Sequence, residues 1–183
     1  MRRLVGSLTL MLVAALLGGC TPGDPVVVSS SSPPVSMPVE PTPQWTDEEQ
    51  AAIDAVQRYI DVWTYISQNL GEADWDAIYE VAEESVAEIN IQSWTIWADE
   101  GWHLVGSPSF IPTSILPGAR DDQGYRQHLY GCFVIQGSYV ADSQGLMVPT
   151  DDRVERGTIT YTVIRTPSDR YILSGNKLEN KPC

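Results

Sequence analysis

The hydrophobic pattern of the chain changes period once, near residue 101, and this change limits the folds open to it. Between residues 46 and 100, apolar side chains recur at the three- and four-residue spacing of amphipathic helices. From residue 102 onward they alternate with polar side chains, which is typical of half-buried strands. Helices followed by strands predict an α+β fold, in which N-terminal helices pack on one face of an antiparallel sheet.

The first predicted helix begins at a capping box. Thr46 can accept a hydrogen bond from the backbone three residues on, while Glu49 reaches back to the backbone of Thr46. The apolar face that follows comprises Ile53, Val56, Ile60, Trp63 and Ile66. We expect the helix to end near residues 69–71, where Gly71 offers a left-handed stop.

A second helical segment is predicted from Asp74. Its apolar face comprises Trp75, Ile78, Tyr79 and Ala82, with Val86 and Ile89 as extensions. The helical pattern weakens over residues 89–98, because the segment opens with β-branched residues. Trp94 and Trp97 restore the pattern, and the segment is expected to end at Gly101.

The strand-forming half contains one clear hairpin and two longer, less regular segments. In the hairpin, Thr158, Thr160 and Thr162 share one face of the first strand and large apolar residues share the other. The predicted elements are strands 158–163 and 171–175 joined by a turn at 166–169, a strand 125–140 with bends at Gly131 and Gly137, and a weaker strand 105–116 interrupted by Pro108 and Pro112.

The N-terminus has the pattern of an export signal. Two arginines precede an apolar stretch that is too short for a confident membrane span, and Leu-Gly-Gly-Cys occupies positions 17–20. This tetrapeptide is similar to a bacterial lipobox, so we expect cleavage after residue 19 and lipidation of Cys20. The lipid would anchor the chain to the cell membrane, facing the extracytoplasmic side. The alternative is an ordinary signal peptide with an accidental cysteine.

Residues 20–44 are predicted to form a tether between the lipid and the folded part. They are rich in proline and serine, which favour neither a helix nor a sheet and leave little to bury. The sequence therefore divides into a signal peptide over 1–19, a lipidated cysteine with its tether over 20–44, and a single α+β domain over 45–183.

The charge balance excludes one class of partner. The formal net charge is −13, which disfavours nucleic-acid binding. Residues 46–100 hold 14 acidic side chains and a single arginine. Either these helices turn a solvated acidic face outward, or this face docks a basic partner.

Cys132 and Cys183 remain once Cys20 is assigned to lipid. In an exported chain they predict a disulfide, which would close a loop of 51 residues. Such a loop stabilises the fold by about 4 kcal/mol in the chain-entropy model. A redox pair or a metal site is the weaker alternative, because the chain has no C-x-x-C motif and only two histidines. No metal and no cofactor is predicted.

These features together resemble a known family. The lipobox, the tether, the amphipathic helix, the segment Asp-Trp-Asp-Ala-Ile-Tyr at 74–79, the Gly131–Cys132 pair and the C-terminal Cys183 are similar to small secreted actinobacterial lipoproteins. The domain of those proteins is nuclear transport factor 2-like (SnoaL-like). The resemblance implies a cone in which three helices lean against a strongly curved sheet and enclose a pocket. It implies no reaction, because most members of the group have none established.

The sequence names no catalytic residue. Cone-shaped domains of this kind include isomerases and cyclases, which use a carboxylate base and oxyanion donors in an apolar pocket. Side chains of suitable type are Tyr59, Asp61, Tyr79, His128 and Tyr130, but none lies in an enzymatic motif. The residues predicted to line a pocket are Trp63, Trp97, His128 and Tyr130. The tryptophans could equally fill an ordinary core.

The function predicted from these features is a lipid-anchored, non-enzymatic module that binds a small apolar ligand or another envelope protein. The first alternative is a small-molecule isomerase or cyclase that uses the pocket of the cone. The second is an interaction module that forms a homodimer through the threonine face of the sheet.

Overall fold

The computed structural model describes residues 44–121, 124–149, 155–179 and 181–183. The predicted signal peptide, Cys20 and residues 21–43 of the tether lie outside the described residues. The elements are α1 (Asp47–Gln68), the 3-10 helix η1 (Trp75–Glu80), α2 (Glu84–Glu100), β1 (His103–Val105), β2 (Ser109–Asp121), β3 (Gly124–Val134), β4 (Tyr139–Ala141), β5 (Arg156–Arg165) and β6 (Tyr171–Glu179). In this part of the chain no helix combines the length and the apolar character needed to cross a membrane.

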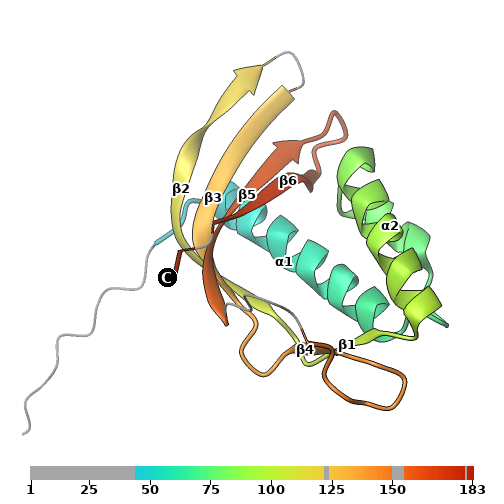
Figure 1. Cartoon of the computed structure of the whole chain (residues 1–183). Coiled ribbons are helices and arrows are strands. Elements are labelled where there is room, and N and C mark those ends of the chain that lie inside the picture. Colours follow the sequence, from blue (N-terminus) through green and yellow to red (C-terminus); the bar gives the residue numbers. More distant parts are fainter. Residues whose placement is uncertain (1–43, 122–123, 150–154, 180) are drawn as a thin grey trace, which may run out of the picture. The chain divides into compact units, whose positions relative to one another are not determined.

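Antiparallel pairing organises the strands into two sheets. The larger sheet has the order β2-β3-β5-β6, and β1 pairs with β4 in a separate two-stranded sheet. Figure 1 shows α1 and α2 on the same side of the curved larger sheet. Helices followed by antiparallel strands confirm the predicted α+β class. The predicted β5–β6 hairpin is also confirmed, with Asp169 in the left-handed region of its turn (φ 65°).

Helix α1 begins where the capping box predicts. The backbone N–H of Glu49 donates to the Thr46 hydroxyl at 3.3 Å, and the backbone N–H of Thr46 donates to Glu49 Oε2 at 2.8 Å. The prediction that Gly71 ends the helix as a left-handed stop is wrong. Asn69 is the C-cap, and its side-chain amide donates to the Tyr65 carbonyl at 2.8 Å. Because the side chain satisfies a carbonyl of the last turn, no left-handed glycine is needed there.

The second helical segment is broken in two, contrary to the continuous pattern expected from Asp74. Asp74 caps only the short η1, by accepting from the backbone N–H of Asp76 at 3.1 Å. The chain then bridges to β6: Leu173 N–H donates to the Val81 carbonyl at 2.9 Å, and Glu83 N–H donates to the Leu173 carbonyl at 2.7 Å. These two bonds interrupt the helix, and α2 starts immediately afterwards.

Residues 89–98 are helical throughout, as part of α2. The helix ends at Gly101 in the left-handed conformation (φ 69°), as predicted. Trp94 is 1% exposed, and its indole N–H donates to the Ser67 hydroxyl of α1 at 2.8 Å. Ile89, predicted as an extension of the apolar face, is instead 65% exposed, because the break before Glu84 resets the face that α2 buries.

The long strand predicted over 125–140 is two strands in different sheets. β3 ends at Val134, and a turn that closes with Ser138 N–H donating to the Ile135 carbonyl at 2.8 Å contains Gly137 (φ 78°). The following residues form β4, which pairs with β1. The weaker strand predicted over 105–116 is likewise divided between β1 and β2. Pro112 is tolerated because β2 is an edge strand with a register shift directly after it.

Gly131 has a different role from the predicted bend. It pairs in regular register with Pro112 and with Ile159. A Cβ at this position would overlap the Ile111 carbonyl and the ring of Phe110. The missing side chain lets Phe110 lie over β3 and pack edge-on against Tyr161, with ring centroids 5.0 Å apart.

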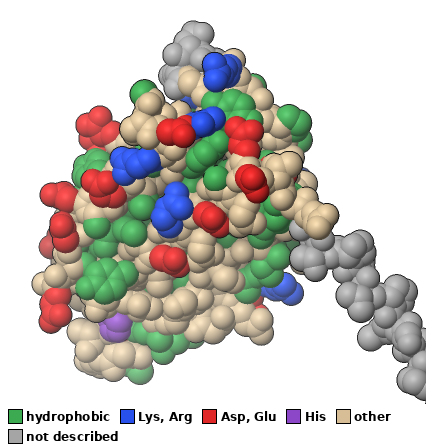
Figure 2. Space-filling view, turned by 180° about the vertical axis from the view of Figure 1, so that it is seen from behind, with side chains coloured by type: hydrophobic (Ala, Val, Ile, Leu, Met, Phe, Trp, Pro, Cys, Tyr) green, Lys and Arg blue, Asp and Glu red, His purple; other side chains and the backbone are tan. Residues whose placement is uncertain are grey.

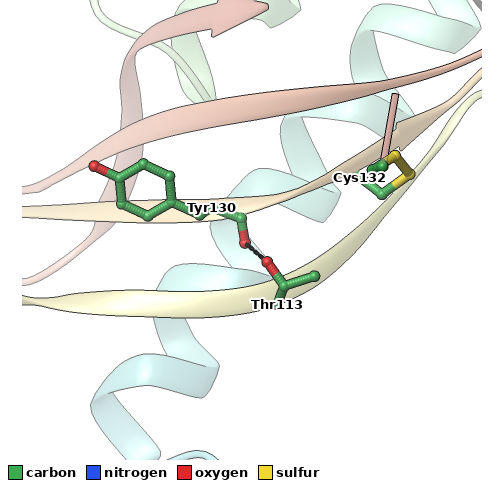
Figure 3. The surroundings of a disulfide bond; sticks show 4 residues. Thr113, Tyr130 and Cys132 are labelled. Atoms are coloured by element: carbon green, nitrogen blue, oxygen red, sulfur yellow. Dashed lines mark hydrogen bonds between the residues drawn. A yellow bond between two sulfur atoms is a disulfide. The ribbon is translucent and has the colours of Figure 1, made fainter. Parts of the chain in front are cut away.

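Cys132 and Cys183 form the predicted disulfide, with their Cα atoms 5.7 Å apart. Figure 3 shows the bond beside β3, near Tyr130, whose carbonyl accepts from the Thr113 hydroxyl of β2 at 3.2 Å. The tail is also held by Thr158 N–H, which donates to the Lys181 carbonyl at 2.9 Å. Lys181 and Cys183 are therefore fixed to the middle strands of the sheet.

Candidate functional site

The alternation of side chains along β3 and β5 gives the larger sheet two different faces. The inner face, toward the helices, carries Leu129, Phe133, Ile159, Tyr161 and Val163, most of them fully buried. The outer face carries His128 and Tyr130, which pair in register with Thr162 and Thr160. Residues one position apart in a strand therefore belong to different sites.

The first cavity lies between the helices and the small sheet, with a volume of about 180 Å³. Trp63 of α1 and Trp97 of α2 form one wall and pack edge-on, with ring centroids 6.4 Å apart. The remaining lining residues are Leu104, Pro108, Phe133, Ile135, Ser138, Tyr139, Val140 and Val148. Trp63 and Trp97, two of the four residues predicted to line a pocket, are therefore brought together at this cavity.

A second cavity of about 230 Å³ lies further along the inner face of the larger sheet. Its apolar lining is Ile60, Trp63, Phe133, Ile159 and Leu178, and its polar lining is Tyr59, Asn90, Tyr161 and Asn176. The two cavities share Trp63 and Phe133, so these two side chains form the partition between them. Asn176 and Leu178 of the edge strand β6 are exposed, which makes this side the mouth.

Two tyrosines supply the hydroxyl groups of the second cavity. Tyr59 donates to Asn90 Oδ1 at 3.4 Å, and Asn90 Nδ2 donates to the Tyr59 oxygen at 3.1 Å and to the Val86 carbonyl at 2.8 Å. Burial raises the pKa of Tyr59, and burial together with the neighbouring Tyr59 raises the pKa of Tyr161. Both groups are therefore neutral hydroxyls at physiological pH.

Tyr161 differs from Tyr59 in its hydrogen bonding. The residue is 2% exposed, and within the described residues its hydroxyl has no hydrogen-bond partner. Its cross-strand neighbour on β6 is Asn176, at the mouth. The hydroxyl oxygen is not among the described side-chain atoms that are fully buried without a partner, so it is accessible from the cavity and available to a molecule that enters.

His128 and Tyr130, the other two residues predicted to line a pocket, are not brought together with Trp63 and Trp97 and line neither cavity. They lie on the outer face in a groove of about 390 Å³ together with Thr160, Thr162, Gly175, Asn176, Lys177 and Glu179. His128 Nδ1 is 3.1 Å from the Thr162 hydroxyl. Leu129, the residue between them, points to the core, so the two-residue period of β3 directs both side chains away from the helices.

The remaining sequence candidates lie outside the cavities. Asp61 is exposed on α1 and accepts from Gln57 Nε2 at 2.8 Å, as its place on the polar side of the helix predicts. Tyr79 is 41% exposed. Across the described residues, no group of three or more His, Cys, Asp or Glu side chains is placed to hold a metal ion.

The sequence did not single out Tyr161, Asn90 and Asn176 as cavity residues. Tyr161 lies on the apolar side of the strand predicted over residues 158–163, where the pattern treats it as a large apolar residue and ignores its hydroxyl. Asn90 lies in the stretch 89–98, where the helical pattern weakens, so the pattern does not indicate which face of a helix it would occupy. The usable signal for Tyr161 is its alternation with Thr160 and Thr162, which places it on the inner face without indicating a cavity there.

Acidic side chains outnumber basic ones in the chain, by 24 to 11. Figure 2 shows acidic side chains along one border of the molecule and lysine and arginine side chains among acidic ones nearer one end. In the β5–β6 hairpin, Arg170 pairs with Glu80 at 3.1 Å and Arg165 pairs with Asp169. Tyr171 donates to Glu48 Oε1 at 3.1 Å. Burial and this carboxylate raise the pKa of Tyr171 to about 12.

No family model and no curated protein matches this chain. Several solved structures are similar to it, including the following two. The intermembrane space region of the chloroplast protein ARC6 has 12% identity and a TM-score of 0.48, and the match covers 74% of this chain and 98% of that chain. A Catenulispora acidiphila protein has 11% identity and a TM-score of 0.41, and the match covers 72% and 93% of the two chains. Likenesses this low assign neither a family nor a function.

Proposed function

We propose that this chain is a lipid-anchored extracytoplasmic protein that binds a small apolar ligand between its helices and the inner face of its sheet. The observation that carries the proposal is the pair of adjoining cavities beside Trp63. Their lining is aromatic and aliphatic with a few polar groups, which is the usual composition of a small-molecule site. The cone-shaped, nuclear transport factor 2-like architecture is part of this proposal, and the cavities beside the inner face of the sheet support it.

Binding is favoured over catalysis by the chemistry of the lining. Every described residue that lines the two cavities is uncharged, and none is a histidine or a carboxylic acid. General acid–base catalysis needs a group that titrates near the working pH. The two tyrosines have pKa values raised away from neutrality, so neither suits that role. The isomerase alternative relied on His128, Tyr130 or a pocket carboxylate. The two named side chains lie on the opposite face, and no Asp or Glu is among the described residues that line the cavities.

Ligand binding is tested with the full-length lipidated chain in nanodiscs and toluene as the probe. We expect toluene to raise the melting temperature, because at ten times its Kd a ligand adds about 1.4 kcal/mol of stability. Ile159→Phe should remove the shift, because the larger ring occupies the second cavity. Ile96→Phe makes the same change at a 58% exposed position of α2 and should keep it.

Equal shifts in both variants and the parent would contradict the proposal, because the probe would then be acting through the lipid or at another site. Ile60→Phe, at another residue that lines the second cavity, gives the same comparison if Ile159→Phe does not fold.

The anchor is tested separately, by labelling with radioactive palmitate in a bacterial host. The parent chain should carry the label and sediment with membranes. Cys20→Ala should lose the label, whereas Cys183→Ser should keep it. Labelling of Cys20→Ala would refute lipidation at this position.

A further inference from the structure

The unpartnered Tyr161 hydroxyl specifies what part of a ligand the second cavity can recognise. The tyrosine ring is fixed by Phe110, which packs edge-on against it. Its oxygen has no hydrogen-bond partner among the described residues, although the residue is almost completely buried. A phenol held in one place with an unused O–H is a donor suited to a ligand oxygen that can accept.

The other polar groups are less available for this purpose. Tyr59 and Asn90 already bond to each other, and Asn90 also donates to the Val86 carbonyl. Asn176 is exposed at the mouth, where water can satisfy its amide. Among the described polar groups of the second cavity, the Tyr161 hydroxyl is therefore the donor that is neither engaged in a hydrogen bond nor exposed at the mouth.

The charge of the ligand follows from the same lining. The described walls of both cavities contain no lysine, arginine or histidine that could neutralise an anion. Burial already disfavours the tyrosinate form of Tyr161, and a ligand carboxylate in its place would lose its hydration in the same way. The strongly negative chain adds a further unfavourable contribution for anions.

The size of the ligand is limited by the partition. The cavities of about 180 and about 230 Å³ are each smaller than a typical drug-sized pocket. A molecule with a short apolar chain can fill the second cavity and rest against Trp63 and Phe133. Its polar atom would then lie near Tyr161.

From this arrangement we infer that the cavity selects an uncharged ligand whose carbonyl oxygen accepts a hydrogen bond from Tyr161, with a short apolar chain against Trp63 and Phe133. The inference rests on the proposed function, because it names the class of ligand for the same cavity. A ketone and an ester share this carbonyl chemistry, whereas a fatty acid is excluded as the carboxylate.

The experiment compares heptan-2-one, heptanoate and toluene on the full-length lipidated chain in nanodiscs at neutral pH, with Kd obtained from thermal shifts. Heptan-2-one should bind and heptanoate should not. Tyr161→Phe should weaken heptan-2-one binding about tenfold, the value of one buried hydrogen bond, and leave toluene binding unchanged. Tyr65→Phe, at a 60% exposed position of α1, should change neither.

The outcomes separate the two proposals. If neither toluene nor heptan-2-one binds, the proposed function fails. If toluene binds but Tyr161→Phe leaves the Kd of heptan-2-one unchanged, or if heptanoate binds more tightly than the ketone, only the carbonyl inference fails. If Tyr161→Phe does not fold, the infrared carbonyl stretch of bound heptan-2-one decides. A shift to lower wavenumber supports the hydrogen bond, and a stretch typical of an apolar solvent overturns it.

Discussion

Removal of the Ser67 hydroxyl should destabilise the chain far more than the loss of one small polar group from a helix normally does. Ser67 is fully buried on α1, and its oxygen accepts the indole N–H of Trp94 at 2.8 Å across the interface between the helices. Trp94 is 1% exposed, so water cannot replace the lost acceptor. Ser67→Ala therefore leaves a buried N–H unsatisfied, at a cost of about 1–3 kcal/mol in the free energy of unfolding.

The matched control is Ser93→Ala on α2. Its hydroxyl donates to the Ile89 carbonyl at 3.0 Å on an exposed part of the helix, where water replaces the bond. We expect this change to cost less than about 0.5 kcal/mol. The assay is urea unfolding followed by far-ultraviolet circular dichroism, which reports mainly helix content. The slope of the free energy of unfolding against urea concentration should be the same in both variants and the parent, because the surface exposed on unfolding is unchanged.

A double-mutant cycle isolates the bond itself. Trp94→Phe removes the donor and also leaves space in the core, so its own cost is larger. In the Trp94→Phe background, Ser67→Ala should cost about 1 kcal/mol less than in the parent, because no indole N–H remains to be stranded. Equal costs of Ser67→Ala in both backgrounds would refute the reasoning.

Three further predictions concern other parts of the fold. Cys183→Ser should lower the free energy of unfolding by about 4 kcal/mol for a 51-residue loop, and reduction of the parent should match it in urea unfolding; an unchanged midpoint would contradict this. Because the folded-state pKa of Tyr171 is raised to about 12, its contribution to stability is present below pH 10 and is lost as the pH rises through 12. As the pH rises from 10 to 12, the free energy of unfolding of Tyr171→Phe should thus fall less than that of Tyr65→Phe. Parallel curves of this free energy against pH for the two variants would count against the raised pKa of Tyr171. Gly131→Ala should cost about 1–3 kcal/mol through overlap with β2, whereas Gly71→Ala, which meets nothing within 4 Å, should be nearly neutral; similar melting temperatures would disprove the close approach.

Elements whose ends are fixed by local contacts could be predicted from the sequence. The start of α1 depends on Thr46 and Glu49, three residues apart, and the β5–β6 turn depends on residues 166–169. The end of α2 depends on the left-handed Gly101. Each of these signals lies within a few residues of the boundary that it sets, so a pattern in the sequence is enough.

The errors fall where a boundary is set by a distant segment. The helical pattern after Asp74 continues through Ala82, but pairing with Leu173 interrupts it. The alternation of β3 continues into β4, but pairing with β1 turns the chain into another sheet at Gly137. Neither partner can be identified from the periodicity of the segment it interrupts.

The candidate site was predictable only in part, for a related reason. The aromatic side chains of the helical half indicated Trp63 and Trp97, because large apolar residues at helical spacing must face the sheet. His128 and Tyr130 were assigned to the same pocket because the pattern of one strand does not state which of its faces meets the helices. Whether the Tyr161 hydroxyl has a hydrogen-bond partner depends on which distant side chains pack around it. The hydrophobic pattern of the strand does not contain this information.

The attachment of Cys183 to Cys132 determines how the sheet resists mechanical load. Tension applied at Cys183 bypasses β6 and reaches β3 through the disulfide, between the neighbouring strands β2 and β5. Both ladders beside β3 then bear the force together, whereas a free tail would let β6 peel from the edge one hydrogen bond at a time. Reduction of a single bond should therefore convert a shear-loaded sheet into one that unzips.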